Sequence, residues 1–390
     1  MFQAIKPYAK HDGLIRNLWS IYGTDPPVDD PSRIYGVRWD KTASPNLERV
    51  YDSVGMVAEA GVGAQIVQND FDNTWFNFEK VQDDYGNHFV RIPKFYIRKS
   101  DEDSYFEWAV SQVKHDDSYY LPWCFWDFDN DEELPYVDIG AYEASSSDNK
   151  LASIPEATIL RNTTIVDFRT LARNNNTGSI KGYQQYDIHV HDIIQTLMFI
   201  EFATLNMQSI MRGRVQSAFE PVTTTGFSSS IAASSGSLIN NTGGTNPCVW
   251  RGIENPYGNL YKFVDGVNIS YRQAWVCKNA ELYSSDVFAH PYEQLGYVNA
   301  YSDDYVTRLG FDENLPFAQF PVEVGGSEST YFCDYYRQNS GQRVAQVGGH
   351  YDSGLHAGPS YWYLNTLSSY TSAGFSARLV KKAINEPKGD

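Results

Sequence analysis

The stretch VGGHYDSGLHAGPSYWYLNTLSSYTSAGFSARL, residues 347–379, decides the expected fold of this 390-residue chain. It contains one Asp and one Arg, no Lys, Glu or Cys, and an abundance of Ser, Gly, Tyr and His. Rigid aromatic side chains supply contact area, and small polar side chains supply adaptable hydrogen bonds. Glycines allow a loop-rich backbone to turn tightly. The composition is therefore typical of an adaptable binding surface on a β-rich scaffold.

A second stretch, WRGIENPYGNLYKFVDG at residues 250–266, has strong turn chemistry in its Asn-Pro-Tyr-Gly-Asn run at 255–259. The run leads into an expected strand with Leu260, Tyr261 and Phe263. This stretch resembles the N-x-x-G-N-v-W-E-W motif of formylglycine-generating-enzyme-like proteins, a branch of the C-type lectin fold. Lys262 replaces the usual acidic residue, and Phe263 replaces the usual Trp.

Residues 347–379 resemble the terminal variable segment of phage and bacterial proteins that are diversified by diversity-generating retroelements. The matching positions are Gly348, Gly349, Gly354, Ala357, Gly358, Tyr361, Trp362, Leu364, Asn365, Ser368, Ser369, Arg378 and Leu379. Tyr351 stands where Trp is common, and Ser376-Ala377 where Gly and an apolar residue are common. Together the two resemblances imply an α+β, C-type-lectin-like fold with many short antiparallel strands, long loops and one main helix.

Hydrophobic periodicity places the other elements. Strands are expected at 34–39, 66–71, 88–98 and 136–143. We expect the one main amphipathic helix at Asp187–Arg212, because Asp187 can cap it and an apolar stripe follows. That stripe consists of Val190, Ile193, Ile194, Leu197, Met198, Phe202 and Leu205.

The resulting division of the chain has four parts. Residues 1–33 are expected to be an arm or attachment segment, because a Pro- and Asp-rich run at 25–31 stops any preceding helix. Residues 34–89 form a β-rich N-terminal region, residues 90–382 the C-type-lectin-like recognition domain, and residues 383–390 a disordered tail.

Charge and cysteine use exclude several classes of function. The formal net charge is −17, and an acidic surface repels nucleic acid and anionic membranes. Residues 1–17 lack a signal-peptide pattern, and no apolar run is long enough to insert into a membrane. The four cysteines lack metal-ligand spacing, so we expect buried free thiols and no cofactor. The acidic loop at 127–133 has D-x-D-x-D spacing, which leaves calcium as an alternative to a solvated loop.

The favoured function is receptor binding. By resemblance, we expect an adhesin of a bacteriophage tail that is made in the host cytoplasm, resides in the virion and acts as a homotrimer. Its partners would be a host cell-surface protein or glycan, and other tail proteins through its N-terminal part. The alternatives are a structural head-fibre or baseplate protein, and a formylglycine-generating-enzyme-like oxidase. The oxidase is disfavoured because residues 347–379 contain no cysteine to bind copper.

The candidate receptor-binding residues lie between the glycines and apolar positions that we assign to the scaffold. We expect them on one exposed face, above buried Trp362, Leu364 and Phe375. They are His350, Tyr351, Asp352, Ser353, Leu355, His356, Ser360, Tyr363, Thr366, Tyr370 and Ser372. No catalytic residue is expected.

Overall fold

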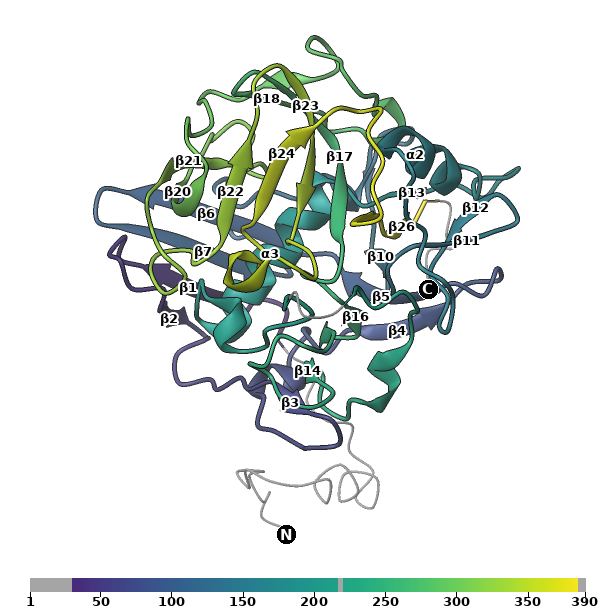
Figure 1. Ribbon diagram of the computed structural model, residues 1–390. Helices are drawn as coiled ribbons and strands as arrows, with labels where there is room; N and C mark the ends of the chain where they lie inside the picture. The colour runs from purple at the N-terminus through teal and green to yellow at the C-terminus, as the bar shows by residue number, and fades with distance from the viewer. Residues whose placement is uncertain (1–29, 217–219, 385–390) are drawn as a thin grey trace.

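The computed structural model describes residues 30–216 and 220–384, which form mostly short β-strands (Figure 1). The two α-helices of this part of the chain are α2 (Ile165–Arg173) and α3 (Ile188–Phe202). Neither helix is long and apolar enough to cross a bilayer. The single-turn 3-10 helices are Asp70–Asn73, Trp123–Phe125, Met207–Ser209, Phe227–Ser230, Ala280–Leu282 and Gly354–His356. Many short strands, long loops and few helices agree with the expected α+β class.

The largest sheet has nine strands, and its central members come from the C-terminal third of the chain. Pairing is antiparallel except between β22 and β24 and between β17 and β25. In order across the sheet, the strands are β19 (Glu293–Gln294), β18 (Gln273–Val276), β17 (Tyr261–Ser270), β23 (Gln342–Val347), β24 (Trp362–Thr366), β22 (Tyr335–Gln338), β20 (Asp304–Leu309) and β21 (Pro321–Val324), with β25 (Phe375–Ser376) beside β17.

Smaller sheets complete the molecule. A five-stranded sheet has the order β13 (Tyr183–Gln185), β26 (Leu379–Lys382), β10 (Tyr136–Gly140), β5 (His88–Pro93) and β4 (Glu79–Gln82). A four-stranded sheet has the order β2 (Glu48–Tyr51), β1 (Tyr35–Trp39), β7 (Tyr105–Ser111) and β6 (Tyr96–Glu102). A second has β16 (Ile253–Glu254), β15 (Cys248–Trp250), β14 (Gly236–Ser237) and β3 (Gly61–Val62). Two-stranded ribbons are β11 (Ser145–Ser147) with β12 (Lys150–Ala152), and β8 (Trp126–Asp127) with β9 (Glu132–Glu133).

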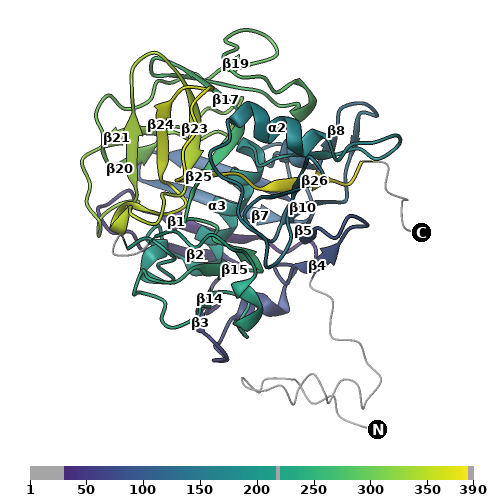
Figure 2. The ribbon, with the colours of Figure 1, turned by 45° about the vertical axis from the view of Figure 1, so that its right-hand side comes forward.

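Helix α3 lies at the centre of the fold, with strands around it (Figure 2). The Asp187 carboxylate accepts a hydrogen bond from Val190 N at 2.9 Å and caps the helix, as expected. All fifteen of its residues are buried, so the helix is enclosed on every side and does not present a single apolar stripe. The prediction that it extends to Arg212 is wrong. It ends at Phe202, because Ala203 adopts the left-handed conformation (φ 49°) and terminates the helix.

Two strand predictions also need correction. Residues 66–71 do not form a strand, since a 3-10 turn capped by Asn69 begins at Asp70. The expected strand at 88–98 is two strands, β5 and β6, in two different sheets. The chain leaves the first sheet after Pro93, which has no N–H to donate and commonly ends a strand.

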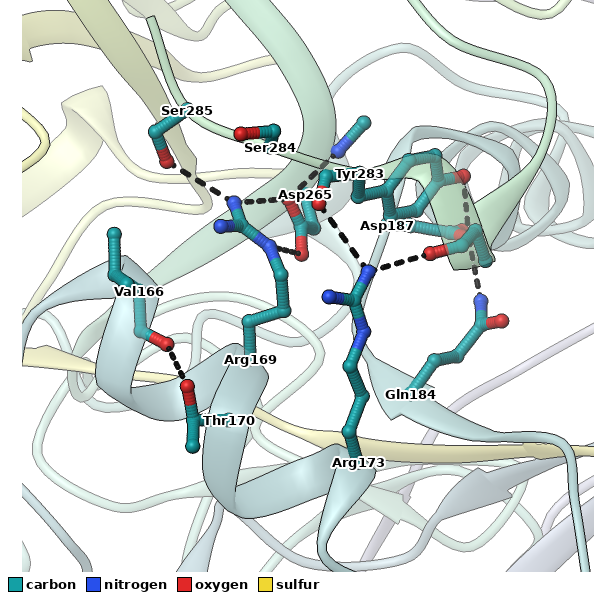
Figure 3. Close-up of polar contacts among 12 residues, drawn as sticks. Val166, Arg169, Thr170, Arg173, Gln184, Asp187, Asp265, Tyr283, Ser284 and Ser285 are labelled. Carbon is teal, nitrogen blue, oxygen red and sulfur yellow. Dashed lines mark hydrogen bonds and ion pairs between the residues drawn. The ribbon is translucent and has the colours of Figure 1, made fainter. Parts of the chain in front are cut away.

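Helix α2 was not expected from the sequence, and a buried polar network holds it in place (Figure 3). Arg169 makes two 2.7 Å hydrogen bonds to the Asp265 carboxylate on β17, in a bidentate pair. Arg173 donates to the carbonyls of Ala280 and Tyr283. Charge-assisted hydrogen bonds therefore fix α2 to the nine-stranded sheet and to the loop that follows β18.

Residues on both sides of the expected boundary at 89/90 share one core. Tyr35, Phe71 and Val90 belong to the same buried cluster as Ile269 and Trp362. Residues 34–89 are therefore packed into the main body of the protein. The expected arm at 1–33 and tail at 383–390 lie outside the described residues, apart from 30–33 and 383–384.

Candidate functional site

Strand β24 separates core side chains from outward-facing side chains. Trp362 points towards α3, and its ring lies 4.9 Å from that of His191 on this helix and 4.3 Å from that of Phe320, which precedes β21. Trp362, Leu364 and Phe375 are buried, as expected of the scaffold. Tyr363 points to the opposite side, because successive side chains of a strand alternate between its faces, and its ring stacks on Tyr261 at 4.8 Å.

Outward-facing aromatic side chains from several strands and loops form one continuous surface, which we call the aromatic face. Strands β17, β23, β24 and β22 lie side by side beneath it, on one side of α3 (Figures 1 and 2). Ring contacts of 4.4 to 6.5 Å connect its members. Its partly exposed or exposed members are Tyr305, Tyr335, His350, Tyr351, His356, Tyr363 and Tyr370, and the buried rings of Tyr261, Tyr361 and Phe375 lie beneath and connect them.

Two expected binding residues, His350 and His356, contact tyrosines at this face. The His356 ring stacks on Tyr335 with centroids 4.4 Å apart and planes 16° apart. The His350 ring lies 4.6 Å from Tyr261. Burial lowers the pKa of both imidazoles below the usual value, so both are neutral at neutral pH. They act as aromatic and hydrogen-bonding groups rather than as cations.

The other expected binding residues divide into two groups. Tyr351, Leu355 and Ser372 are partly exposed, and Asp352 and Tyr370 are exposed. The expectation that Ser353, Ser360 and Thr366 are exposed is wrong, because all three are buried.

Each buried residue has a hydrogen-bonding role within the scaffold. Ser353 Oγ accepts from His350 N at 2.9 Å. Ser360 Oγ accepts from the Gln195 amide of α3 at 3.1 Å, and Ser360 N donates to Asp334 at 2.7 Å. Thr366 hydrogen bonds to Gln346. A short polar side chain in this segment can thus hold the backbone, which the sequence alone does not distinguish from a binding role.

Glycines determine the path of the loop that leads to β24. Gly349 has φ 73°, and a Cβ atom there would lie 2.7 Å from that of Ala357. At Gly358 a Cβ atom would lie 2.0 Å from the Asp334 carboxylate. Contacts this short do not occur, so Gly349 is required by both its conformation and Ala357, whereas a side chain at Gly358 would force the buried Asp334 carboxylate to move.

The aromatic face also includes residues that sequence analysis missed. Tyr305 on β20 and Tyr335 on β22 contribute one side of it, with ring centroids 5.3 Å apart. Arg337, two residues after Tyr335 on β22, lies opposite Tyr363 of β24. These residues precede the 347–379 segment, and only strand pairing brings them beside it. The abundance of tyrosine was the one signal in the sequence.

The 250–266 motif forms a buried anchor beneath this region. The side-chain amides of Asn255 and Asn259 both donate to one oxygen of Glu143, at 2.8 and 2.6 Å. The Lys262 ammonium donates to the carbonyl groups of Gly258 and Leu260. Lys262, which replaces the acidic residue of the resembled motif, is buried and lies 3.7 Å from Glu143. The motif stabilises the fold and presents little surface for binding.

Two hollows with charged linings are further candidate sites. Hollows of about 400 and 320 Å³ lie beside β13 and β26, and Tyr183 lines both. Several of their charged groups are engaged within the protein: Asp83 accepts from Tyr183 at 2.6 Å, and Arg91 pairs with Asp138 at 2.8 Å.

The acidic loop at 127–133 was the expected alternative for calcium. The Asp127 carboxylate accepts hydrogen bonds from Asp129 N and from the Asn130 side chain. Asp129 forms an ion pair with Lys181 at 2.7 Å. Across residues 30–216 and 220–384, no group of three or more His, Cys, Asp and Glu side chains is placed to hold a metal ion.

Comparisons with known proteins find similarity at the level of structure and not of sequence. No model of a protein family matches the chain, and no curated protein sequence matches it. A solved structure described as "Major Tropism Determinant U1 Variant" is similar over 76% of this chain, with 11% sequence identity and a TM-score of 0.28. The matched region spans 63% of that protein.

Proposed function

We propose that this protein is a non-catalytic recognition protein that binds its target through the aromatic face. The observation that carries the proposal is the continuous tyrosine- and histidine-rich surface above a rigid, buried scaffold. Tyrosine supplies large contact area with little loss of side-chain entropy, which is why it is abundant in binding surfaces. The half-buried rings are already ordered by one another, so binding would immobilise few additional rotamers.

The biological role that we propose is receptor binding by a bacteriophage tail. It rests on the resemblance of residues 347–379 to the variable segments of phage proteins of C-type-lectin fold. In this role the protein is a homotrimer in the virion, the N-terminal part faces the particle, and the target is a host cell-surface molecule. Active diversification of the 347–379 coding region would require a reverse-transcriptase gene and an imperfect copy of that region nearby in the genome.

The oxidase alternative requires cysteine thiolates to bind copper, and the cysteines of this chain do not favour that form. Cys277 and Cys333 are buried, and burial raises the pKa of these thiols to about 11 and about 12. Both therefore stay protonated at neutral pH, whereas a thiolate is the form that binds metal. The structural-particle alternative predicts no binding to cells, and the following experiment tests it.

The test is binding of the fluorescently labelled full chain to a panel of intact bacterial strains. We expect wild-type protein to bind some strains. The double variant that combines Tyr335→Ala and Tyr363→Ala should bind those strains more weakly. Tyr301→Ala is the matched control, because Tyr301 is 84% exposed and lies outside the aromatic face. Binding to no strain, or equal loss with the Tyr301 variant, would contradict the proposed function. Light scattering of the same protein tests the trimer.

A further inference from the structure

Arg337 is a cation within the aromatic face. Its ion-pair partner among the described residues, Asp303, lies at a long distance. Arg337 lies on β22, opposite Tyr363 of β24 on one side, and next to Asp303 before β20 on the other. Its Nε atom is 3.7 Å from the Asp303 carboxylate, and both side chains are about half exposed. The guanidinium donates no hydrogen bond to any residue of the described chain. An exposed pair with this geometry contributes little to stability.

The charge of Arg337 acts on neighbouring groups of the aromatic face. Burial raises the pKa of Tyr335 and Tyr361 and lowers that of His356, and in each case the charge of Arg337 adds a smaller lowering. The guanidinium therefore lies close enough to act on at least three groups of the face. A carboxylate brought here with water excluded would form the planar, bidentate pair that arginine favours, and a desolvated pair of this kind is stronger than an exposed one.

The arrangement of the rings favours a protein partner over a sugar. Tyr335 is in ring contact with His356, Tyr305 and Tyr361, and Tyr363 with Tyr261 and Phe375, so each ring is packed against neighbours on several sides and is only partly exposed. A sugar ring usually packs flat on an open aromatic face. Ring edges and hydroxyl groups are instead suited to the backbone and side-chain contacts of a protein interface.

Acidic side chains surround this centre. Asp304, Glu328 and Asp352 form no ion pair with another residue of the described ranges, and Glu328 and Asp352 are exposed. The charges of Asp304 and Glu328 both act on the pKa of His356, after the larger effects of burial and Arg337, which places them beside the face. The face therefore presents one cation, Arg337, with Asp303 beside it and further carboxylates nearby, and binding surfaces pair with the complementary pattern.

We infer that the aromatic face binds a protein receptor, with an acidic side chain of that receptor against Arg337 and basic side chains of the receptor opposite Asp304, Glu328 and Asp352. This inference rests on the proposed function and specifies its partner. An arginine that is desolvated in an interface is a typical energetic hot spot, whereas charges that stay exposed mainly affect the association rate.

The experiment compares Arg337→Gln with Arg308→Gln on strains that bind the wild-type chain. Arg308 on β20 is a matched control, since its side chain is 52% exposed and pairs with Glu323 at 3.2 Å. We expect Arg337→Gln to weaken binding at least about tenfold, as for an interface hot spot, and Arg308→Gln to change it less than about twofold, as for a charge away from the interface centre.

A second arm identifies the class of receptor. Protease treatment of the cells should abolish binding, and periodate oxidation of their glycans should leave it unchanged. Binding that survives protease but is lost after periodate would overturn this inference while leaving cell recognition intact, and so would an Arg337→Gln variant that binds like wild type. Failure of the wild-type chain to bind any strain would instead contradict the proposed function.

Discussion

Two neighbouring residues of β24, Trp362 and Tyr363, allow stability and binding to be separated. Trp362 is 1% exposed and packs between Phe320 and His191. Replacing it with alanine removes this packing and leaves a cavity, which costs about 3–5 kcal/mol of the free energy of unfolding. Tyr363 is half-buried and loses mainly its stacking on Tyr261, so Tyr363→Ala should cost about 1 kcal/mol.

The assay is urea denaturation followed by circular dichroism, with cell binding measured on the same preparations. Tyr301→Ala should change stability by less than about 0.5 kcal/mol, because that side chain is largely exposed. Tyr363→Ala should lose binding but remain folded, and Trp362→Ala should lose stability. The reasoning is refuted if Tyr363→Ala destabilises the protein as much as Trp362→Ala, since Tyr363 would then be part of the core.

Three further predictions concern the interior. Burial raises the pKa of Glu254 from 4.5 to about 7. Between these values the folded state keeps a proton that the unfolded state has released, so the free energy of unfolding should fall as pH rises from about 4.5 to about 7, and Glu254→Gln should flatten this slope in pH-dependent urea titrations. Arg251→Met should cost about 3–5 kcal/mol by thermal or urea unfolding, because it leaves buried Glu201 without its ion-pair partner. Incubation with a cysteine-bearing peptide and copper should give no oxygen consumption that depends on Cys277 or Cys333, and such consumption at an oxygen electrode would contradict the non-catalytic proposal.

Local signals in the sequence predicted local features well. The cap at Asp187 and the start of α3 follow from one acidic residue before an apolar run. The strand at β1 and the start of β10 follow from short, alternating apolar segments. The burial of Trp362 and Leu364 follows from their size and apolarity. Each of these features depends on residues close to one another in the chain.

Features that depend on distant residues could not be predicted in the same way. Glu201 is buried in α3 because Arg251, fifty residues later, forms an ion pair with it at 2.8 Å. Lys99 is likewise buried through its contact with Asp192. Tyr335 and Arg337 join the aromatic face only because β22 pairs with β24. No periodicity within a short window contains this information, because the partner that decides the environment lies in another element.

Within residues 347–379, separate side chains hold the loop and face outward, which would allow the proposed binding surface to vary on a constant fold. At Gly349 a Cβ atom would collide with Ala357, and at Gly358 it would displace the buried Asp334 carboxylate, so both positions hold the loop closely. Ser360 fixes it through hydrogen bonds to Gln195 and Asp334. Tyr363 projects from this framework without forming the contacts that hold the backbone. A substitution at Tyr363 can therefore alter recognition while the loop keeps its path, whereas the same substitution at Ser360 would disturb the whole face.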